Sequence, residues 1–125
     1  MATSAVIGLY NEDLKSVDLT MIWMDGYEEK AGKKLATKYK DKFDVADLFE
    51  LAGNGIRVLG DDADSTEYGN AKVAKSYKAE SLNSAFERAK QYSDRHRASL
   101  IYIFDNDNEQ WMTLSRSGEP IKLTA

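Results

Sequence analysis

The segment from Ile22 to Leu35 constrains the fold of this chain most, because the spacing of its apolar residues changes there. Before the change, Leu19 to Met24 is a short apolar run of the kind that forms a buried strand. After it, apolar side chains recur every four residues, as in a helix, at Tyr27, Ala31, Leu35 and Tyr39. The segment therefore predicts a strand, a tight turn and a helix. Gly26 behind Asp25 is expected to supply the unusual backbone angles that the turn needs.

Two pairs of apolar segments predict antiparallel hairpins near the two ends of the chain. Ala5 to Tyr10 pairs with Leu19 to Met24, and both are nearly continuous apolar runs, which favours central positions in a sheet. Leu100 to Phe104 pairs with Gln110 to Leu114 across a polar turn at Asp105 to Glu109.

Two further helices are predicted from capping residues and apolar stripes. One runs from Asp44 to Ala52, with Asp44 as its N-cap and Gly53 as its C-cap. The other follows Ser81, which has the chemistry of an N-cap. The side chains expected to point inward are Val45, Leu48 and Phe49 in the first, and Leu82, Ala85, Phe86, Ala89 and Tyr92 in the second.

The segments between these elements are less regular. Gly55 to Gly60 is either a short strand or a buried turn, Asp61 to Asn70 is an acidic loop, and Ala71 to Tyr77 is a further strand candidate. The tail over residues 116–125, which holds Pro120, is expected to fray. These elements predict a single α+β domain with a mostly antiparallel sheet of about five or six strands, in the order ββααβ(β)αββ, and helices packed on one face.

Composition excludes several classes of protein. The chain has 125 residues, of which 42% are hydrophobic and 30% charged, so it can bury one globular core. A net charge of -4 argues against nucleic acid and membrane surfaces as partners. The absence of cysteine excludes disulfides and thiolate chemistry and suits the cytoplasm. Apolar runs far shorter than the ~20 residues of a membrane span, and an N-terminus without a signal-peptide pattern, agree with that expectation.

No residue pattern predicts a catalytic centre, a metal site or a cofactor. Asp105 to Glu109 lacks the glycine and the twelfth-position glutamate of a calcium loop. Gly53 to Gly60 lacks the Lys-Ser/Thr pair of a phosphate-binding loop. His96 is the sole histidine and is expected on the surface at a helix end. Asp25 is the highest-ranked acid, but the role favoured for it is an Asx turn or a cap for the helix that starts at Tyr27.

Opposite charges separate into two neighbouring blocks. Residues 30–42 carry six lysines against Asp41, whereas residues 43–67 carry seven acids against Arg57. The blocks either bind partners of opposite charge or neutralise each other across the fold. A lysine-covered helix face is most often only a solvated face.

The turn region has a distinctive order of residues: Trp23-Met24-Asp25-Gly26-Tyr27, then Gly32, Leu35 and Tyr39. This order resembles that of a family of small bacteriophage and prophage proteins, which typically show a hydrophobic strand, His-Trp-Asp-Gly-Tyr and a helix. Later parts of the chain look similar at Leu48 to Gly60, Tyr102 to Phe104 and Gln110-Trp111. Trp23 stands where the family has histidine, and Met24 where it has tryptophan. The resemblance implies no activity, but it implies a phage accessory protein in the cytoplasm of its bacterial host.

The leading hypothesis is a non-enzymatic phage protein that binds a host bacterial protein and modulates or inhibits it, in host takeover or anti-defence. The candidate binding residues are Trp23, Asp25, Tyr27, Lys30, Lys34, Arg57, Tyr68 and Trp111. An alternative is a module that binds a nucleotide or phosphorylated metabolite through the Asp25-Gly26 turn, the lysines and Arg57. A third is a small hydrolase that uses Asp25 with another acid. A homodimer through the edge of an N-terminal strand is also open.

Overall fold

The computed structural model describes residues 3–123. Its strands are β1 (Ala5–Asn11), β2 (Ser16–Ile22), β3 (Ile56–Val58), β4 (Glu67–Tyr68), β5 (Lys75–Lys78), β6 (Leu100–Asp105), β7 (Gln110–Leu114) and β8 (Pro120–Lys122). Its α-helices are α1 (Lys33–Lys38), α2 (Lys42–Leu51) and α3 (Leu82–His96). A π-helical turn, η1 (Glu28–Gly32), precedes α1, and a 3-10 turn, η2 (Ala52–Asn54), follows α2.

The strands form one mixed sheet in the order β4-β3-β2-β1-β6-β7-β8, with β5 paired to β2 outside this path. β1 lies at the centre, antiparallel to β2 and parallel to β6, so that Ile7 pairs with Thr20 on one side and with Tyr102 on the other. β2 and β3 form the second parallel pair, and the remaining pairs are antiparallel. The predicted α+β class with a mostly antiparallel sheet is confirmed, but the described residues form eight strands rather than five or six.

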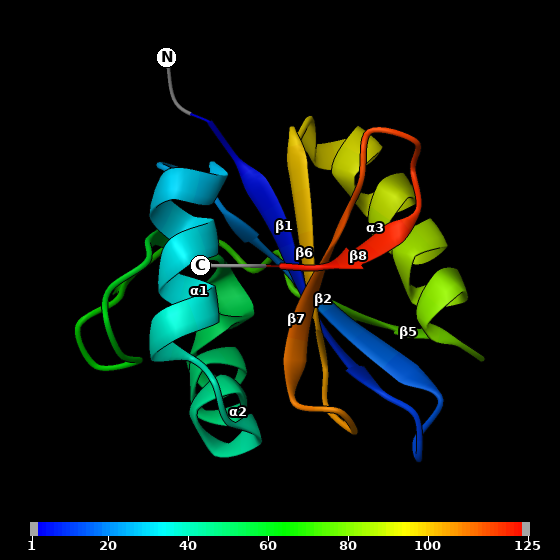
Figure 1. Cartoon of the computed structure of the whole chain (residues 1–125). Helices are drawn as coiled ribbons and strands as arrows, with labels where there is room; N and C mark the ends of the chain where they lie inside the picture. The colour runs from blue at the N-terminus through cyan, green and yellow to red at the C-terminus, as the bar shows by residue number, and fades with distance from the viewer. Residues whose placement is uncertain (1–2, 124–125) are drawn as a thin grey trace.

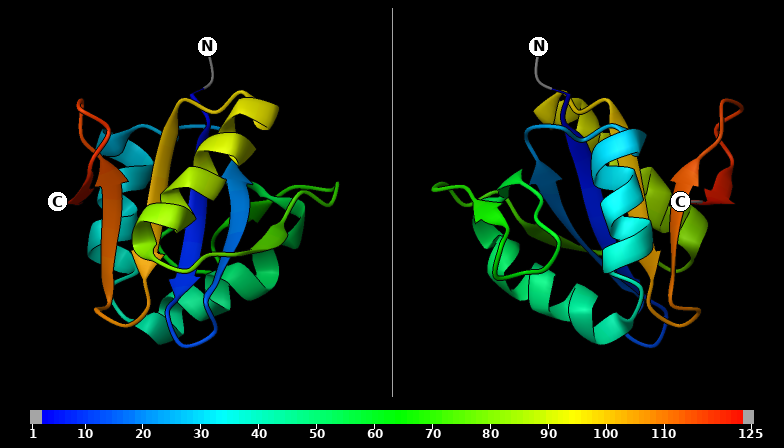
Figure 2. Two further views of the ribbon diagram at one scale, coloured as in Figure 1. Left: turned by 90° about the vertical axis from the view of Figure 1, so that its right-hand side faces the viewer. Right: turned by 60° about the vertical axis from the view of Figure 1, so that its left-hand side comes forward.

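The helices lie on both faces of the sheet, so the prediction of helices on one face is wrong. In Figure 1 the sheet is seen nearly edge-on, with α1 and α2 on one side and α3 on the other. The two views in Figure 2 show α3 lying across one face and α1 across the opposite face. The physical reason is the nearly continuous apolar sequence of the central strands, because a strand that is apolar on both faces must be covered on both.

Alternate residues of the central strands serve two separate cores. In β1, Ala5 and Ile7 pack under α1 and α2, while Val6 and Tyr10 pack under α3. The first core also holds Leu35, Tyr39, Val45, Leu48, Tyr102, Phe104 and Trp111. The second also holds Leu19, Met21, Ala85, Phe86, Ala89, Tyr92 and Ile103. The period-2 alternation of a strand therefore places each core on its own face.

The turn after β2 is built differently from its prediction. Asp25, not Gly26, takes the left-handed backbone conformation, with a φ of 57°. Aspartate is among the residues that tolerate this region. Gly26 is required instead by close packing, because a Cβ there would lie 2.9 Å from the backbone nitrogen of Ala5. The helical turn then begins at η1, after Tyr27, and no side chain caps it, so the predicted capping role of Asp25 is also wrong.

The helix caps agree with the sequence in part. Ser81 caps α3 through its hydroxyl and forms a capping box with Ser84, as predicted for this N-terminus. α2 begins two residues earlier than predicted, because the carboxylate of Asp41 rather than Asp44 accepts hydrogen bonds from the first free N–H groups. The residue with positive φ after α2 is Gly55 rather than Gly53, because η2 continues the helical path.

Four segments that the sequence left irregular or uncertain contain short strands. The segment from Gly55 to Gly60 contains β3, and the predicted loop from Asp61 to Asn70 contains β4. The strand predicted over Ala71 to Tyr77 starts later, as β5. The predicted frayed tail contains β8, which pairs with β7, while residues 124 and 125 lie outside the described residues. These strands are short and gain their partners only through long-range pairing, so local periodicity does not reveal them.

Candidate functional site

A groove of about 520 Å³ lies beside β3, next to the ends of β2 and β4. Its lining brings together three of the predicted binding residues, Trp23, Arg57 and Tyr68. The backbone explains how they meet. The N–H groups of Trp23 and Met24 donate to the carbonyl oxygens of Ile56 (2.8 Å) and Arg57 (3.1 Å), which extends the pairing of β2 with β3. β4 then places Tyr68 opposite Ile56. We call this surface the Trp23 groove.

Trp23 is held between the groove and the C-terminal end of α3. Its indole meets the imidazole of His96 edge-on at 6.2 Å between centroids, and that imidazole lies 4.4 Å from the ring of Tyr92. A Cβ at Gly55 would lie 2.8 Å from the indole nitrogen, so the indole needs a glycine at this position. A half-buried indole that is already held in place loses little entropy when a ligand packs on it.

His96 is the last residue of α3, at the predicted helix end, and its side chain is half-buried in this cluster. Burial lowers the pKa of its imidazole below 6.5, and the positive charges of Arg95 and Lys75 lower it further. The neutral ring therefore acts as a packing surface behind Trp23 at neutral pH.

Arg57 lines the groove and forms an ion pair with Glu67, which is not part of the lining. Their side chains are exposed and approach to 3.6 Å. Exposed ion pairs of this kind contribute about 0–1 kcal/mol, so the guanidinium is free to exchange Glu67 for a carboxylate or carbonyl of a partner. Beside it, Met24 is 40% exposed, although it is a large apolar side chain.

Tyr68 also lines the groove. Its hydroxyl donates to the carbonyl oxygen of Ala63 at 2.7 Å, which orients the ring. Burial raises the pKa of this phenol above 10, and the neighbouring carboxylates of Asp64 and Asp62 raise it further. The neutral phenol thus presents a fixed aromatic edge to the groove.

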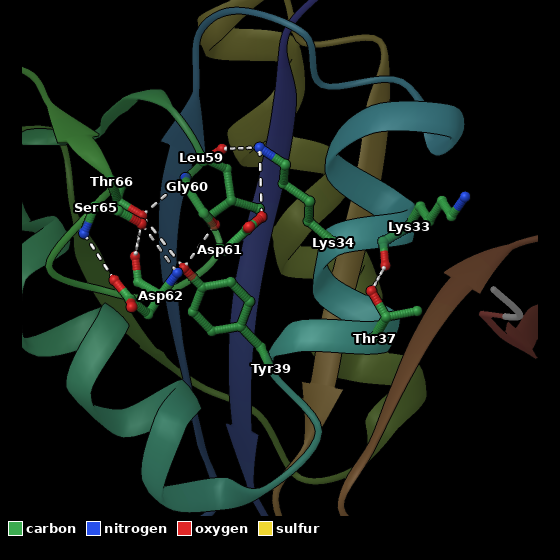
Figure 3. A network of polar contacts seen from close by, with 10 residues as sticks. All are labelled: Lys33, Lys34, Thr37, Tyr39, Leu59, Gly60, Asp61, Asp62, Ser65 and Thr66. Atoms are coloured by element: carbon green, nitrogen blue, oxygen red, sulfur yellow. Dashed lines mark hydrogen bonds and ion pairs between the residues drawn. The ribbon is translucent and has the colours of Figure 1, made fainter.

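Lys34 lies elsewhere and secures the loop after β3. Its ammonium donates to the carbonyl oxygen of Leu59 at 2.9 Å and lies 3.9 Å from the carboxylate of Asp61 (Figure 3). The hydroxyl of Tyr39 reaches the same loop at the carbonyl oxygen of Gly60, 3.0 Å away. The predicted opposite charge blocks therefore meet at Lys34 and Asp61, and Lys34 has a structural partner.

Trp111 cannot act as an exposed binding residue, because it is buried in the core. Its indole N–H donates to the carbonyl oxygen of Tyr39 at 2.9 Å, and its ring packs 5.3 Å from that of Phe104. Asp25 and Lys30 are exposed and Tyr27 is half-buried, but none of these three predicted residues lines the Trp23 groove.

Sequence reasoning missed several residues of the groove, namely Met24, Asn54, Asn70 and Val73. Only Met24 left a signal, as an apolar residue directly before the turn at Asp25. Asn54 precedes β3 and Asn70 follows β4, so the two residues flank the β3–β4 pair in the sequence. They meet because the N–H of Gly69 donates to the carbonyl oxygen of Gly55.

No family model, curated protein or solved structure matches the chain. Within residues 3–123 no group of histidine and acidic side chains is arranged to hold a metal ion. The same part of the chain contains no helix with the length and apolar character needed to cross a membrane. The side chains that line the Trp23 groove include two aromatic rings, an exposed thioether, a guanidinium and two amides.

Proposed function

We propose that this chain is a non-enzymatic protein-binding domain that docks its partner in the Trp23 groove. The observation that carries the proposal is the convergence of Trp23, Met24, Arg57 and Tyr68 on one concave surface. Tryptophan, tyrosine and arginine dominate the energetics of protein interfaces, and methionine is enriched in them. The amides of Asn54 and Asn70 add hydrogen-bonding groups beside these apolar side chains.

The biological context of the proposal comes from the resemblance of the Asp25-Gly26-Tyr27 region to phage and prophage proteins. In that context the partner is a host bacterial protein in the cytoplasm, which the chain modulates or inhibits. A groove framed by paired backbone and a packed indole suits this role, because a preformed surface pays less ordering entropy on binding.

The alternative of a nucleotide or phosphorylated metabolite receives less support from the geometry. Its predicted site combined the Asp25-Gly26 turn, the lysines of the first helix and Arg57. The ammonium of Lys34 is instead directed to Leu59 and Asp61, and the guanidinium of Arg57 faces Glu67. To bind both cations, a phosphate would have to displace Asp61 from Lys34 and Glu67 from Arg57.

Affinity capture from a bacterial host lysate, quantified by mass spectrometry, tests the protein-binding proposal. Met24→Ala and Arg57→Ala are each expected to lower recovery of a captured protein by about tenfold, as truncation of an interface hot spot does. The matched controls are Leu14→Ala and Arg116→Ala, which change exposed residues of the same chemistry outside the groove.

Thermal unfolding of each variant checks that the fold is retained. We expect it to be retained, because all four side chains are exposed. Recovery that is equal for the groove variants and their controls would show that the partner binds elsewhere.

A further inference from the structure

Helix α2 keeps large apolar side chains on its outer face. Val45 and Leu48 are buried against the sheet, as in an ordinary surface helix. Phe43 and Leu51, however, are 71% and 51% exposed. The outer face of a surface helix is normally polar. Phe43 and Leu51 stand near the two ends of α2 as separate exposed apolar side chains, and the ammonium of Lys42 lies 5.8 Å from the centroid of the Phe43 ring.

An acidic groove of about 450 Å³ adjoins this face, between α2 and the loop that follows β3. Leu51 forms part of its lining. The charged side chains of the lining are Asp44, Asp47, Glu50, Asp62 and Asp64, opposed by Lys38 alone. We call the groove and the outer face of α2 together the α2 surface.

The wall opposite α2 is preformed. The carboxylate of Asp62 accepts a hydrogen bond from the N–H of Ser65 at 2.8 Å, and its carbonyl oxygen accepts one from the hydroxyl of Thr66 at 2.8 Å (Figure 3). The hydroxyl of Tyr39 joins the same loop to α1 through Gly60. The groove therefore needs little rearrangement to receive a ligand.

The carboxylates of α2 repel one another. The negative charge of Asp41 raises the pKa of Asp44 above its usual value, with smaller contributions from desolvation, a hydrogen bond to Asp41 and the charge of Asp47. In contrast, hydrogen bonds from Ser65 lower the pKa of Asp62, which keeps that carboxylate ionised. Cationic groups placed among these acids would relieve the repulsion.

We propose that the α2 surface docks a basic amphipathic segment of another protein, with lysine or arginine side chains in the acidic groove and apolar side chains over Phe43 and Leu51. Charge complementarity identifies the occupant, because five carboxylates face one lysine in the lining. A second copy of this chain is a poorer occupant, because each copy carries a net charge of -4. The α2 surface shares no lining residue with the Trp23 groove, so this inference is independent of the proposed function.

Titration with synthetic amphipathic peptides tests the inference. The probe carries lysine on one helical face and leucine on the other; one matched peptide has glutamate in place of lysine, and another has serine in place of leucine. Binding is followed by fluorescence anisotropy of the labelled peptide and by NMR shifts of the methyl groups of Leu51 and the ring of Phe43. We expect the lysine–leucine peptide to bind at least about tenfold more tightly than either matched peptide.

Protein variants locate the binding site. Phe43→Ser combined with Leu51→Ser is expected to weaken binding of the lysine–leucine peptide by at least about tenfold, whereas Leu14→Ser, which changes another exposed leucine, leaves it unchanged. Neutralising the groove acids on α2, by Asp44→Asn, Asp47→Asn and Glu50→Gln, is expected to remove most of the salt dependence of the affinity. The control neutralises three exposed acids elsewhere, by Glu87→Gln, Asp94→Asn and Glu119→Gln.

Three outcomes would overturn the inference. The first is equal binding of the lysine–leucine and glutamate–leucine peptides. The second is an affinity that the α2 variants and their controls change alike, because binding would then follow only the net charge of the protein. The third is concentration-dependent dimerisation without peptide that Phe43→Ser with Leu51→Ser abolishes, because the occupant would then be a second copy.

Discussion

Gly26 shows how one residue joins the turn after β2 to the rest of the molecule. Its N–H donates to the carbonyl oxygen of Thr3 at 2.8 Å, and its own carbonyl oxygen accepts from the buried hydroxyl of Tyr102 at 2.8 Å. A Cβ would lie 2.9 Å from the backbone nitrogen of Ala5 and 3.0 Å from the carbonyl oxygen of Thr3. Because these neighbours are backbone atoms, they cannot turn aside as a flexible side chain would.

Replacement of Gly26 by alanine is therefore expected to lower the free energy of unfolding by about 1–3 kcal/mol, the usual cost of overpacking. Urea denaturation measures the change. Gly53→Ala is the matched control, because a Cβ there meets no atom within 4 Å and the φ of Gly53 is not positive. We expect this control to be neutral or slightly stabilising. Equal effects of the two substitutions would rule out the steric explanation.

At the scale of elements, β8 shows how a short strand joins the core. It pairs with β7 from Met112 to Leu114, and the N–H of Leu123, directly after it, donates to the carbonyl oxygen of Trp111 at 2.9 Å. Leu123 is only 6% exposed and belongs to the core under α1 and α2, whereas Ile121 is 45% exposed. The two side chains, two residues apart, thus have different environments.

Leu123→Ala is expected to destabilise the protein by about 2 kcal/mol or more, because it removes a buried side chain from the first core. Ile121→Ala is the control, since the same loss of bulk at an exposed position typically costs within about 0.5 kcal/mol. Thermal and urea unfolding report both values. If Leu123→Ala were as stable as Ile121→Ala, the segment after Ser115 would behave as the frayed tail that the sequence suggested.

At the scale of the whole molecule, buried tyrosines tie stability to alkaline pH. Burial raises the pKa of Tyr39 to about 12 and that of Tyr92 to about 12, and it also raises the pKa of Tyr102. An unfolded tyrosine titrates near 10. Above that pH the unfolded chain loses phenolic protons that the folded chain keeps, so the unfolded state is favoured as the pH rises.

The free energy of unfolding is therefore expected to be independent of these tyrosines below pH ~10 and to fall between pH ~10 and ~12. Each buried tyrosine contributes a slope of up to about 1.4 kcal/mol per pH unit. Urea denaturation over this range measures the slope. Tyr92→Phe removes the hydroxyl that donates to Val73, so it lowers stability at neutral pH but makes the alkaline slope shallower. An unchanged slope would contradict the assignment to Tyr92.

The two proposed docking surfaces also belong to this scale, because each needs several elements. The Trp23 groove combines the end of β2 with β3, β4 and the segment before β5, and the α2 surface combines α2 with the loop before β4. Variants at Met24 and at Phe43 with Leu51 therefore test separate interfaces on one molecule. A loss confined to one of them would assign a partner to that surface.

The amino-acid sequence was sufficient for elements whose signal is local. The pairing of Ala5 to Tyr10 with the next strand, the hairpin across Asp105 to Glu109, and the cap of α3 at Ser81 follow from alternation, turn chemistry and capping within a few residues. The α+β class follows from the same signals. Of the predicted binding residues, Trp23, Arg57 and Tyr68 do lie together.

Long-range packing decided the rest. Trp111 and Met24 are both large apolar residues in the sequence, yet one donates to Tyr39 in the core and the other is exposed beside Arg57. Their environments depend on which strands pair and which face each helix covers, and side-chain identity does not encode either choice locally. Helices cover both faces of the sheet because the central strands are apolar on both faces. The Trp23 groove exists because β3 and β4 add to the edge of the sheet beside the end of β2.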